Sequence, residues 1–162
     1  MFTYTSPDEF KSAYDTLHAT YRTGRTKSLK WRRWQLKQLF WMIDDNKDAI
    51  AQALKQDLNK HAFETTVYDI NGFKAEVLDQ LAHVEKWSQG EAAPGAGFIM
   101  GTLGKAWIRK EPLGVALIIG TWNYGLYTLT PALAAVAAGK QPVIQSTTSA
   151  HSPRQLCNDQ TF

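Results

Sequence analysis

The sequence predicts an α/β fold in which amphipathic helices lead, through a β-hairpin, into a strand–loop–helix unit. Three observations support this prediction. Apolar residues recur at helical spacing over most of residues 8–88. A short run of apolar residues at 115–119 has the composition of a parallel strand that is covered on both faces. An alanine-rich helical pattern then follows and ends at Gly139.

Three helices are expected in the first half of the chain. Ser6, Pro7 and Glu9 form a capping-box pattern that starts the first helix, and Gly24 is suited to end it. A second helix is expected from about residue 28, with one apolar stripe that reaches Leu54. A third is expected over about residues 64–88. Its inward-facing residues are expected to be Val67, Ile70, Val77, Leu81, Val84 and Trp87.

The pattern changes at Gly97 to that of a β-hairpin. Strands are expected at 98–100 and 106–110, on either side of turn residues 101–104. Exposed strand edges of this kind favour pairing with another subunit. The expected division is therefore 1–93 helical, 94–113 hairpin, 114–145 the start of an α/β domain, and 146–162 a polar tail that is disordered or aberrant.

The loop at 120–125 follows the predicted strand, and ligands of parallel α/β folds lie beyond the carboxyl ends of the strands. The loop matches neither glycine-rich phosphate-binding pattern, because Trp122 occupies a required glycine position and Gly125 is followed by Leu126 instead of lysine. Asn123 remains, and its side-chain amide can donate hydrogen bonds to a developing oxyanion. On the residues alone, a structural role in capping the next helix or tying the loop together is favoured.

Glu-Pro-Leu-Gly at 111–114 and Gly-Thr-Trp-Asn-Tyr at 120–124 are the most distinctive motifs of the chain. Together they resemble the aldehyde dehydrogenase superfamily, and most closely its class 3 and fatty-aldehyde branch. The resemblance covers roughly residues 8–139. It implies a dinucleotide-binding domain, NAD or NADP as cofactor, an aldehyde substrate, and a homo-oligomer built through the hairpin. It also implies that Asn123 donates to the oxyanion of the thiohemiacetal.

The resemblance extends to the other residues of the loop. It makes Gly120, Thr121 and Trp122 candidates for cofactor contacts, and Tyr124 a candidate for contact with the substrate. Packing beside a strand end explains the two aromatic residues equally well. No metal site is expected, because the histidines on the helices have no second ligand at metal-binding spacing.

The sequence departs from the family pattern after Gly139. Gln145 and Thr148 stand where the family has the lysine and glutamate that hold the adenosine ribose. Cys157 is the only cysteine, and its neighbours do not match the family's catalytic motif. The sequence therefore predicts a truncated N-terminal portion that neither oxidises aldehydes alone nor binds the cofactor tightly. The alternative is a non-catalytic fragment that pairs with a full-length subunit.

The truncation also carries an expectation for stability. The strand at 115–119 is expected to be a lone parallel strand, because the rest of the family's sheet is missing, and Pro142 disfavours an interior strand after Gly139. The strand and helix residues 133–136 are then expected to lack packing partners and to leave an apolar patch, so that the chain is partly folded or associates to cover it.

The composition excludes several function classes. A net charge of +3, with one notable basic cluster at 27–37, gives no case for nucleic-acid binding. A single cysteine and the lack of a signal-peptide pattern point to a cytoplasmic or other intracellular protein. Residues 112–139 are uncharged, but glycines and Pro131 interrupt them, so no transmembrane helix is expected. A membrane-associated helical protein is the weakest alternative.

Overall fold

The computed structural model describes residues 6–121 and 123–146 of the chain. Helices and strands follow one another in this order: α1 (Pro7–Arg22), η1 (Arg25–Lys27), α2 (Leu29–Asp45), α3 (Lys47–Leu58), α4 (Ala62–Glu64), η2 (Thr65–Ile70), α5 (Asn71–Ser88), β1 (Glu91–Ala92), η3 (Gly97–Leu103), β2 (Trp107–Ile108), β3 (Val115–Gly120), η4 (Tyr127–Leu129), α6 (Thr130–Ala137) and β4 (Gln141–Ser146).

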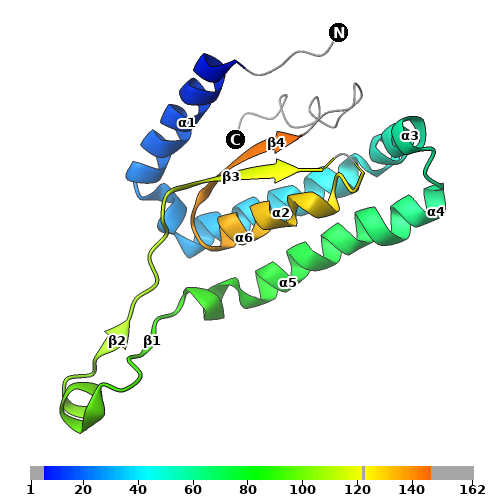
Figure 1. Cartoon of the computed structure of the whole chain (residues 1–162). Helices are drawn as coiled ribbons and strands as arrows, with labels where there is room; N and C mark the ends of the chain where they lie inside the picture. The colour runs from blue at the N-terminus through cyan, green and yellow to red at the C-terminus, as the bar shows by residue number, and fades with distance from the viewer. Residues whose placement is uncertain (1–5, 122, 147–162) are drawn as a thin grey trace.

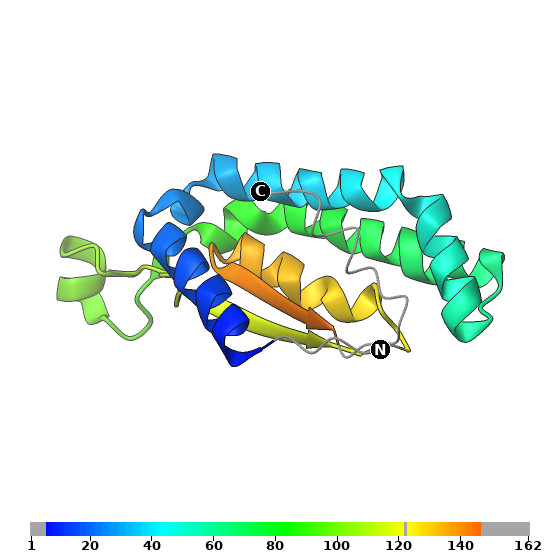
Figure 2. The same ribbon diagram turned by 90° about the horizontal axis from the view of Figure 1, so that it is seen from above.

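The body of the molecule is a parallel strand pair with helices packed against it. β3 and β4 run parallel, with Val115 paired to Gln141 and Gly120 paired to Ser146, and α6 connects them. Helices α2, α5 and α6 pack together on one side of this pair, and α1 contacts both strands (Figures 1 and 2). This arrangement confirms the predicted α/β class, with the strand at 115–119 where it was expected.

The capping signals place the ends of α1 as predicted. The Ser6 hydroxyl accepts from the Glu9 amide at 3.1 Å, and the Ser6 amide donates to the Glu9 carboxylate at 2.7 Å. The helix ends at Arg22, two residues before Gly24.

The prediction of one continuous second helix was wrong, because the helix is broken at Asn46 between α2 and α3. The Asn46 side-chain amide donates to the Met42 carbonyl at 2.7 Å. A side chain that bonds to the local backbone competes with the helical ladder. The apolar stripe continues across the break, because Ile43 and Ile50 both enter the core, and for this reason periodicity alone did not reveal it.

The third helix covers the predicted span, but its first part, η2, is a π-helix. Ile70, Val77 and Val84 face inward as predicted. Val67 and Trp87 are exposed, so these two assignments were wrong. A π-helix bonds i to i+5 and thereby rotates the residues before α5 relative to its inner face. Trp87 instead stacks on the His83 ring at the surface, with 5.3 Å between the ring centroids.

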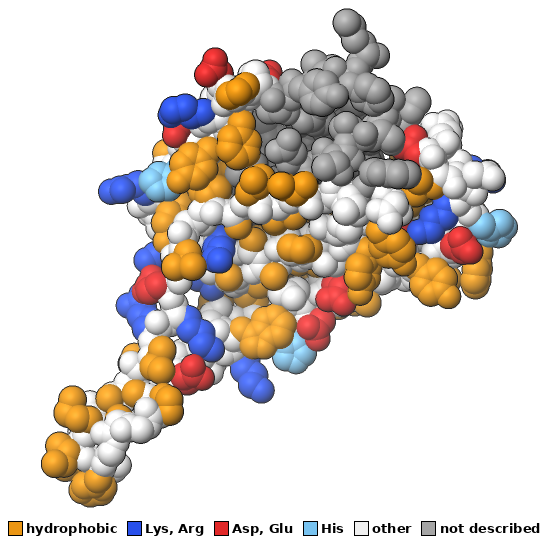
Figure 3. Space-filling model, in the orientation of Figure 1, with side chains coloured by type: hydrophobic (Ala, Val, Ile, Leu, Met, Phe, Trp, Pro, Cys, Tyr) orange, Lys and Arg blue, Asp and Glu red, His pale blue; other side chains and the backbone are white. Residues whose placement is uncertain are grey.

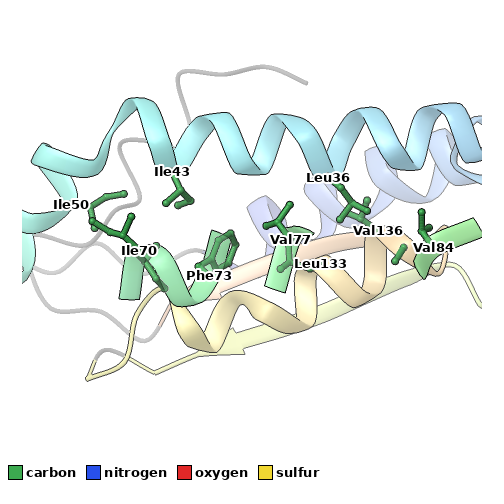
Figure 4. Packing of buried hydrophobic residues seen from close by; sticks show 11 residues of the cluster. Leu36, Ile43, Ile50, Ile70, Phe73, Val77, Val84, Leu133 and Val136 are labelled. Atoms are coloured by element: carbon green, nitrogen blue, oxygen red, sulfur yellow. The ribbon is translucent and has the colours of Figure 1, made fainter. Parts of the chain in front are cut away.

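The core lies where α2, α5 and α6 meet (Figure 4). Its buried members come from helices, and in one case from the turn before η4, that lie up to about a hundred residues apart in the chain: Leu36, Ile43, Ile50, Ile70, Phe73, Val77, Val84, Leu126, Leu133, Val136 and Ala137. Leu133 and Val136 are therefore packed, contrary to the expectation that they lack partners. The helices in the first half of the chain supply the surface that covers them.

The expectation of a lone parallel strand was also wrong, because β4 pairs with β3 along its whole length. Pro142 is paired with Ala116. β4 has one neighbour among the described strands, and proline is tolerated at such an edge. The expected apolar surface is present on part of β3, where Leu117 and Ile119 are 50% and 61% exposed.

The hairpin differs from the prediction in its strands. The antiparallel pair is β1 with β2, and it joins Glu91 to Ile108 and Ala92 to Trp107. The predicted strand at 98–100 lies in the π-helix η3 at the tip of an arm that projects from the body (Figure 1). A short apolar run does not distinguish strand from helix, and glycines at both ends of this run favour a compact turn.

Candidate functional site

The loop predicted to carry function lies directly beyond the carboxyl end of β3. The chain turns over residues 123–126 and enters η4. Asn123 is exposed in this turn, and its side chain has no hydrogen bond to another described residue. Neither η4 nor α6 has a side-chain cap, so helix capping does not account for Asn123. Trp122 lies outside the described residues.

Thr128, which the sequence reasoning missed, holds the loop together. Its hydroxyl oxygen accepts from the Thr121 amide at 3.2 Å, and its hydroxyl donates to the Gly125 carbonyl at 3.2 Å. A Cβ at Gly120 would lie 3.1 Å from this oxygen, so the missing side chain at Gly120 makes room for Thr128. This tie leaves the side chain of Asn123 available for another role.

Tyr124 connects the loop to the helical part of the molecule. Its ring meets the Tyr127 ring edge-on, with 5.7 Å between the centroids. The Lys60 ammonium lies over the Tyr124 ring, 4.7 Å from its centroid. This geometry is that of a cation–π contact. Tyr124 therefore packs against Tyr127 and Lys60 and stays partly exposed.

Lys60 is paired at the same time with the carboxylate of Asp69. The Lys60 Nζ lies 2.5 Å from Asp69 Oδ2, and the side chains are 15% and 0% exposed. Neither carboxylate oxygen of Asp69 has a partner with hydrogen-bond geometry among the described residues. The ion pair is thus the main compensation for a fully buried charge. Sequence reasoning missed both residues, although a carboxylate beside the inward-facing Ile70 was the available signal.

The Glu-Pro-Leu-Gly motif at 111–114 has a structural role at the other end of β3. Glu111 pairs with Lys27 at 2.8 Å and with Arg109 at 2.7 Å. The hydrogen bond from Lys27 is the main reason that the pKa of the Glu111 carboxyl lies below its ordinary value. The Tyr21 hydroxyl donates to the Pro112 carbonyl at 2.6 Å and joins α1 to this segment.

Two of the candidate cofactor contacts have neighbours within the loop. Thr128 fills the space that a side chain at Gly120 would occupy. The candidates Gly120 and Thr121 bond within the sheet and the loop. The described residues also hold no group of three or more potential metal ligands.

The comparisons with known proteins fit this arrangement of strand, loop and helix. The model of the aldehyde dehydrogenase family matches residues 2–153. The chain belongs to the aldehyde dehydrogenase family. Rat aldehyde dehydrogenase family 3 member B1 is 39% identical over 139 residues, which are 85% of this chain and 29% of that protein. Beta-apo-4'-carotenal oxygenase of Gibberella fujikuroi is 33% identical over 147 residues, which are 90% of this chain and 27% of that protein.

The fold of this chain also matches a solved aldehyde dehydrogenase structure. The substrate-bound state of Staphylococcus aureus AldH matches with a TM-score of 0.76 at 25% identity, over 83% of this chain and 29% of that one. These findings confirm the resemblance to the class 3 branch. The chain spans less than a third of the length of the curated relatives named here. Among the described residues, no helix is long and apolar enough to cross a membrane.

Proposed function

We propose that this chain supplies the oxyanion-binding part of an NAD(P)-dependent aldehyde dehydrogenase, with Asn123 as the donor. The observation that carries the proposal is the position of Asn123 in a turn immediately after β3, exposed and without a capping role. Amide donors at such a position stabilise negative charge that develops on a carbonyl oxygen. Attack of a thiolate on an aldehyde places negative charge on that oxygen.

The residues around Asn123 support a rigid donor. Thr128 bonds to Thr121 before Asn123 and to Gly125 after it, and the Tyr124 ring contacts Lys60 and Tyr127. A fixed donor needs little reorganisation when charge develops, and this is the source of its catalytic effect. We assign Tyr124 to the edge of the aldehyde site, because it follows Asn123 in the loop and is partly exposed. Trp122 stays a candidate for contact with the cofactor or the substrate.

The chain alone is proposed to be inactive and to bind NAD or NADP only weakly. Thr128 fills the space at Gly120, and Gln145 and Thr148 replace the ribose-binding lysine and glutamate of the family pattern. Cys157 has neighbours unlike those of the family's nucleophile. We further assign the protein to an intracellular, reducing compartment, which suits thiol chemistry.

A chimera tests the role of Asn123 directly. Residues 8–139 of this chain replace the matched segment of rat aldehyde dehydrogenase family 3 member B1, and NADH formation from an aldehyde is followed. Asn123→Ala is expected to lower kcat by about a hundredfold to a thousandfold. Gln52→Ala removes an exposed amide on α3 and is the control, expected to match the unmodified chimera. Equal kcat for Asn123→Ala and Gln52→Ala would contradict the proposal.

The purified chain gives a second test of the inactivity of the chain alone. No aldehyde-dependent NADH is expected from it. NADH formation that disappears in Cys157→Ala would show that the chain carries its own nucleophile and is an enzyme without further segments.

A non-catalytic partner role is the second candidate, and the projecting arm is the observation that favours it. Phe98, Ile99, Met100 and Leu103 are exposed at its tip (Figure 3). Apolar surfaces of this kind are typical of protein contacts. Co-purification of a tagged chain with an intact aldehyde dehydrogenase, without activity of its own, would support this candidate. Recovery of the tagged chain alone would exclude it.

A further inference from the structure

We propose that Lys60 and Asp69 are positioning residues that fix the orientation of the Asn123 loop through the ring of Tyr124. This inference rests on the proposed role of Asn123 and adds two residues from a different part of the chain. The contacts form a continuous path: Asp69 to Lys60 at 2.5 Å, and Lys60 to the Tyr124 ring at 4.7 Å. Tyr124 is the immediate neighbour of Asn123.

Local backbone geometry brings the two charged groups to the loop. α3 ends at Leu58, and Asn59 adopts a left-handed conformation with φ 51°, which reverses the chain direction just before Lys60. Asp69 lies in the π-helix η2, and π-helical turns occur frequently at functional sites. In this turn Asp69 faces inward, while its neighbour Tyr68 is exposed.

The burial of Asp69 argues for a positioning role. A buried ion pair contributes little net stability, because desolvation offsets the attraction between the charges. A fully buried carboxylate with no hydrogen-bond partner among the described residues is unfavourable unless its cation stays in place. The Lys60 ammonium therefore has a fixed position, and the face of the Tyr124 ring is held against a fixed charge.

The same chain contains a matched contact that lies away from the loop. Lys74 Nζ is 2.5 Å from Asp44 Oδ1 and 4.7 Å from the centroid of the Phe40 ring. Both contacts thus combine one lysine, one carboxylate and one aromatic face at equal distances. Replacing Lys74 and Asp44 therefore removes an ion pair and a cation–π contact of the same kinds, but none of the contacts of the Asn123 loop.

The experiment measures hydrogen exchange of two amides in the full chain. The Thr128 amide donates to the Tyr124 carbonyl and the Leu129 amide to the Leu126 carbonyl, each at 3.0 Å. The double variant Lys60→Gln/Asp69→Asn removes both charges together and leaves no unpaired buried charge. Exchange of these two amides is expected to accelerate about tenfold or more, because the loop opens locally. Amides of the α5 core are expected to keep their exchange rates.

The control double variant is Lys74→Gln/Asp44→Asn, and it is expected to leave exchange at Thr128 and Leu129 within about twofold of the unmodified chain. The side-chain amide signals of Asn123 in a ¹⁵N spectrum are a second readout. They are expected to shift in the Lys60/Asp69 variant and to stay unchanged in the Lys74/Asp44 variant. Equal behaviour of the two double variants in either readout would overturn the proposal.

A pair of variants at Tyr124 covers the case in which the double variant loses its helical circular dichroism. Tyr124→Leu removes the aromatic face and is expected to accelerate exchange in the loop, whereas Tyr124→Phe keeps the face and is expected not to. The same exchange rate in both Tyr124 variants would overturn the proposal. The chimera tests separately whether Asn123 contributes to catalysis. If Asn123→Ala had no effect on kcat there, the exchange rates measured here would still decide whether Lys60 and Asp69 hold the loop.

Discussion

Gly139 and Arg32 are in direct contact, because a Cβ atom at Gly139 would lie 2.7 Å from the Nη2 atom of Arg32. Arg32 is buried and donates to the carbonyls of Thr26, Lys27 and Ala137 and to the Ser88 hydroxyl, at 2.9–3.1 Å. One guanidinium, carried by α2, thus joins η1 to the end of α5 and the end of α6. Its burial lowers the pKa of Arg32.

Gly139→Ala is expected to destabilise the chain for two reasons. Gly139 has φ +75°, a conformation that costs about 1 kcal/mol for alanine, and the new methyl group would meet the Arg32 guanidinium. The clash is expected to add about 1–3 kcal/mol. Gly95→Ala is the matched control, because Gly95 has φ +76° and no atom within 4 Å of the position of its Cβ. Urea unfolding of both variants measures the difference, and equal midpoints would contradict the contact.

Arg32→Leu is expected to lower the free energy of unfolding by about 3 kcal/mol, because it leaves the buried carbonyls of Thr26 and Ala137 and the partly buried carbonyl of Lys27 without this donor. Arg33→Leu is the neighbouring control. Arg33 makes one exposed hydrogen bond, to the Leu81 carbonyl, so a change within about 0.5 kcal/mol is expected. Thermal unfolding followed by circular dichroism separates the two, and comparable losses would show that Arg32 has no special role.

Thr128→Val is expected to loosen the candidate site. The change keeps the shape of the side chain but removes the oxygen that accepts from the Thr121 amide and donates to the Gly125 carbonyl. A loss of about 1–2 kcal/mol is expected, with faster exchange of the Thr121 amide. Thr128→Ser retains the hydroxyl and should stay close to the unmodified chain. Thr16→Val, at an exposed helix position, controls for loss of a threonine hydroxyl.

Glu111 gives a prediction about acid conditions. Its pKa in the folded chain is lower than the ordinary value of 4.5, mainly through Lys27. A lowered folded pKa means that the stabilisation is fully present above the unfolded pKa and is lost as the pH falls through the folded pKa. The difference in stability between the unmodified chain and Glu111→Gln should therefore be constant at neutral pH and shrink below about pH 4.5. A difference that grows on acidification would contradict this sign.

The exposed arm predicts association that depends on concentration. Phe98→Glu and Ile99→Glu place charges on the exposed tip of η3. If this tip is buried in a contact between chains, burial of the unpaired charges would weaken that contact. Light scattering is expected to show larger species for the unmodified chain than for these variants. Lys105→Glu, in the loop after η3, is the control for added negative charge. A monomer at all concentrations for the unmodified chain would argue against assembly through the arm.

The sequence was sufficient for the parts of the fold that depend on local signals. The Ser6–Glu9 capping pattern located the start of α1, and the apolar run located β3 and the loop that follows it. The break at Asn46 and the helical tip of the arm were not predicted, because apolar periodicity is the same with or without them.

The missing part of the site depends on contacts between distant segments. Lys60 precedes Tyr124 by 64 residues, and no local pattern relates a lysine after α3 to a loop after β3. The role of Thr128 could not be predicted either, because it depends on the turn that places its hydroxyl beside the Thr121 amide. Asn123 could be singled out because it carries an amide side chain just beyond a strand end, where ligands bind.

The bond between Arg32 and Ala137 spans 105 residues of the chain. During synthesis, the Arg32 guanidinium therefore cannot make this bond until α6 has emerged from the ribosome. Until then, the apolar faces of α2 and α5 that pack against α6 are uncovered. A chaperone that recognises such faces could therefore bind this chain until α6 docks on α2 and α5.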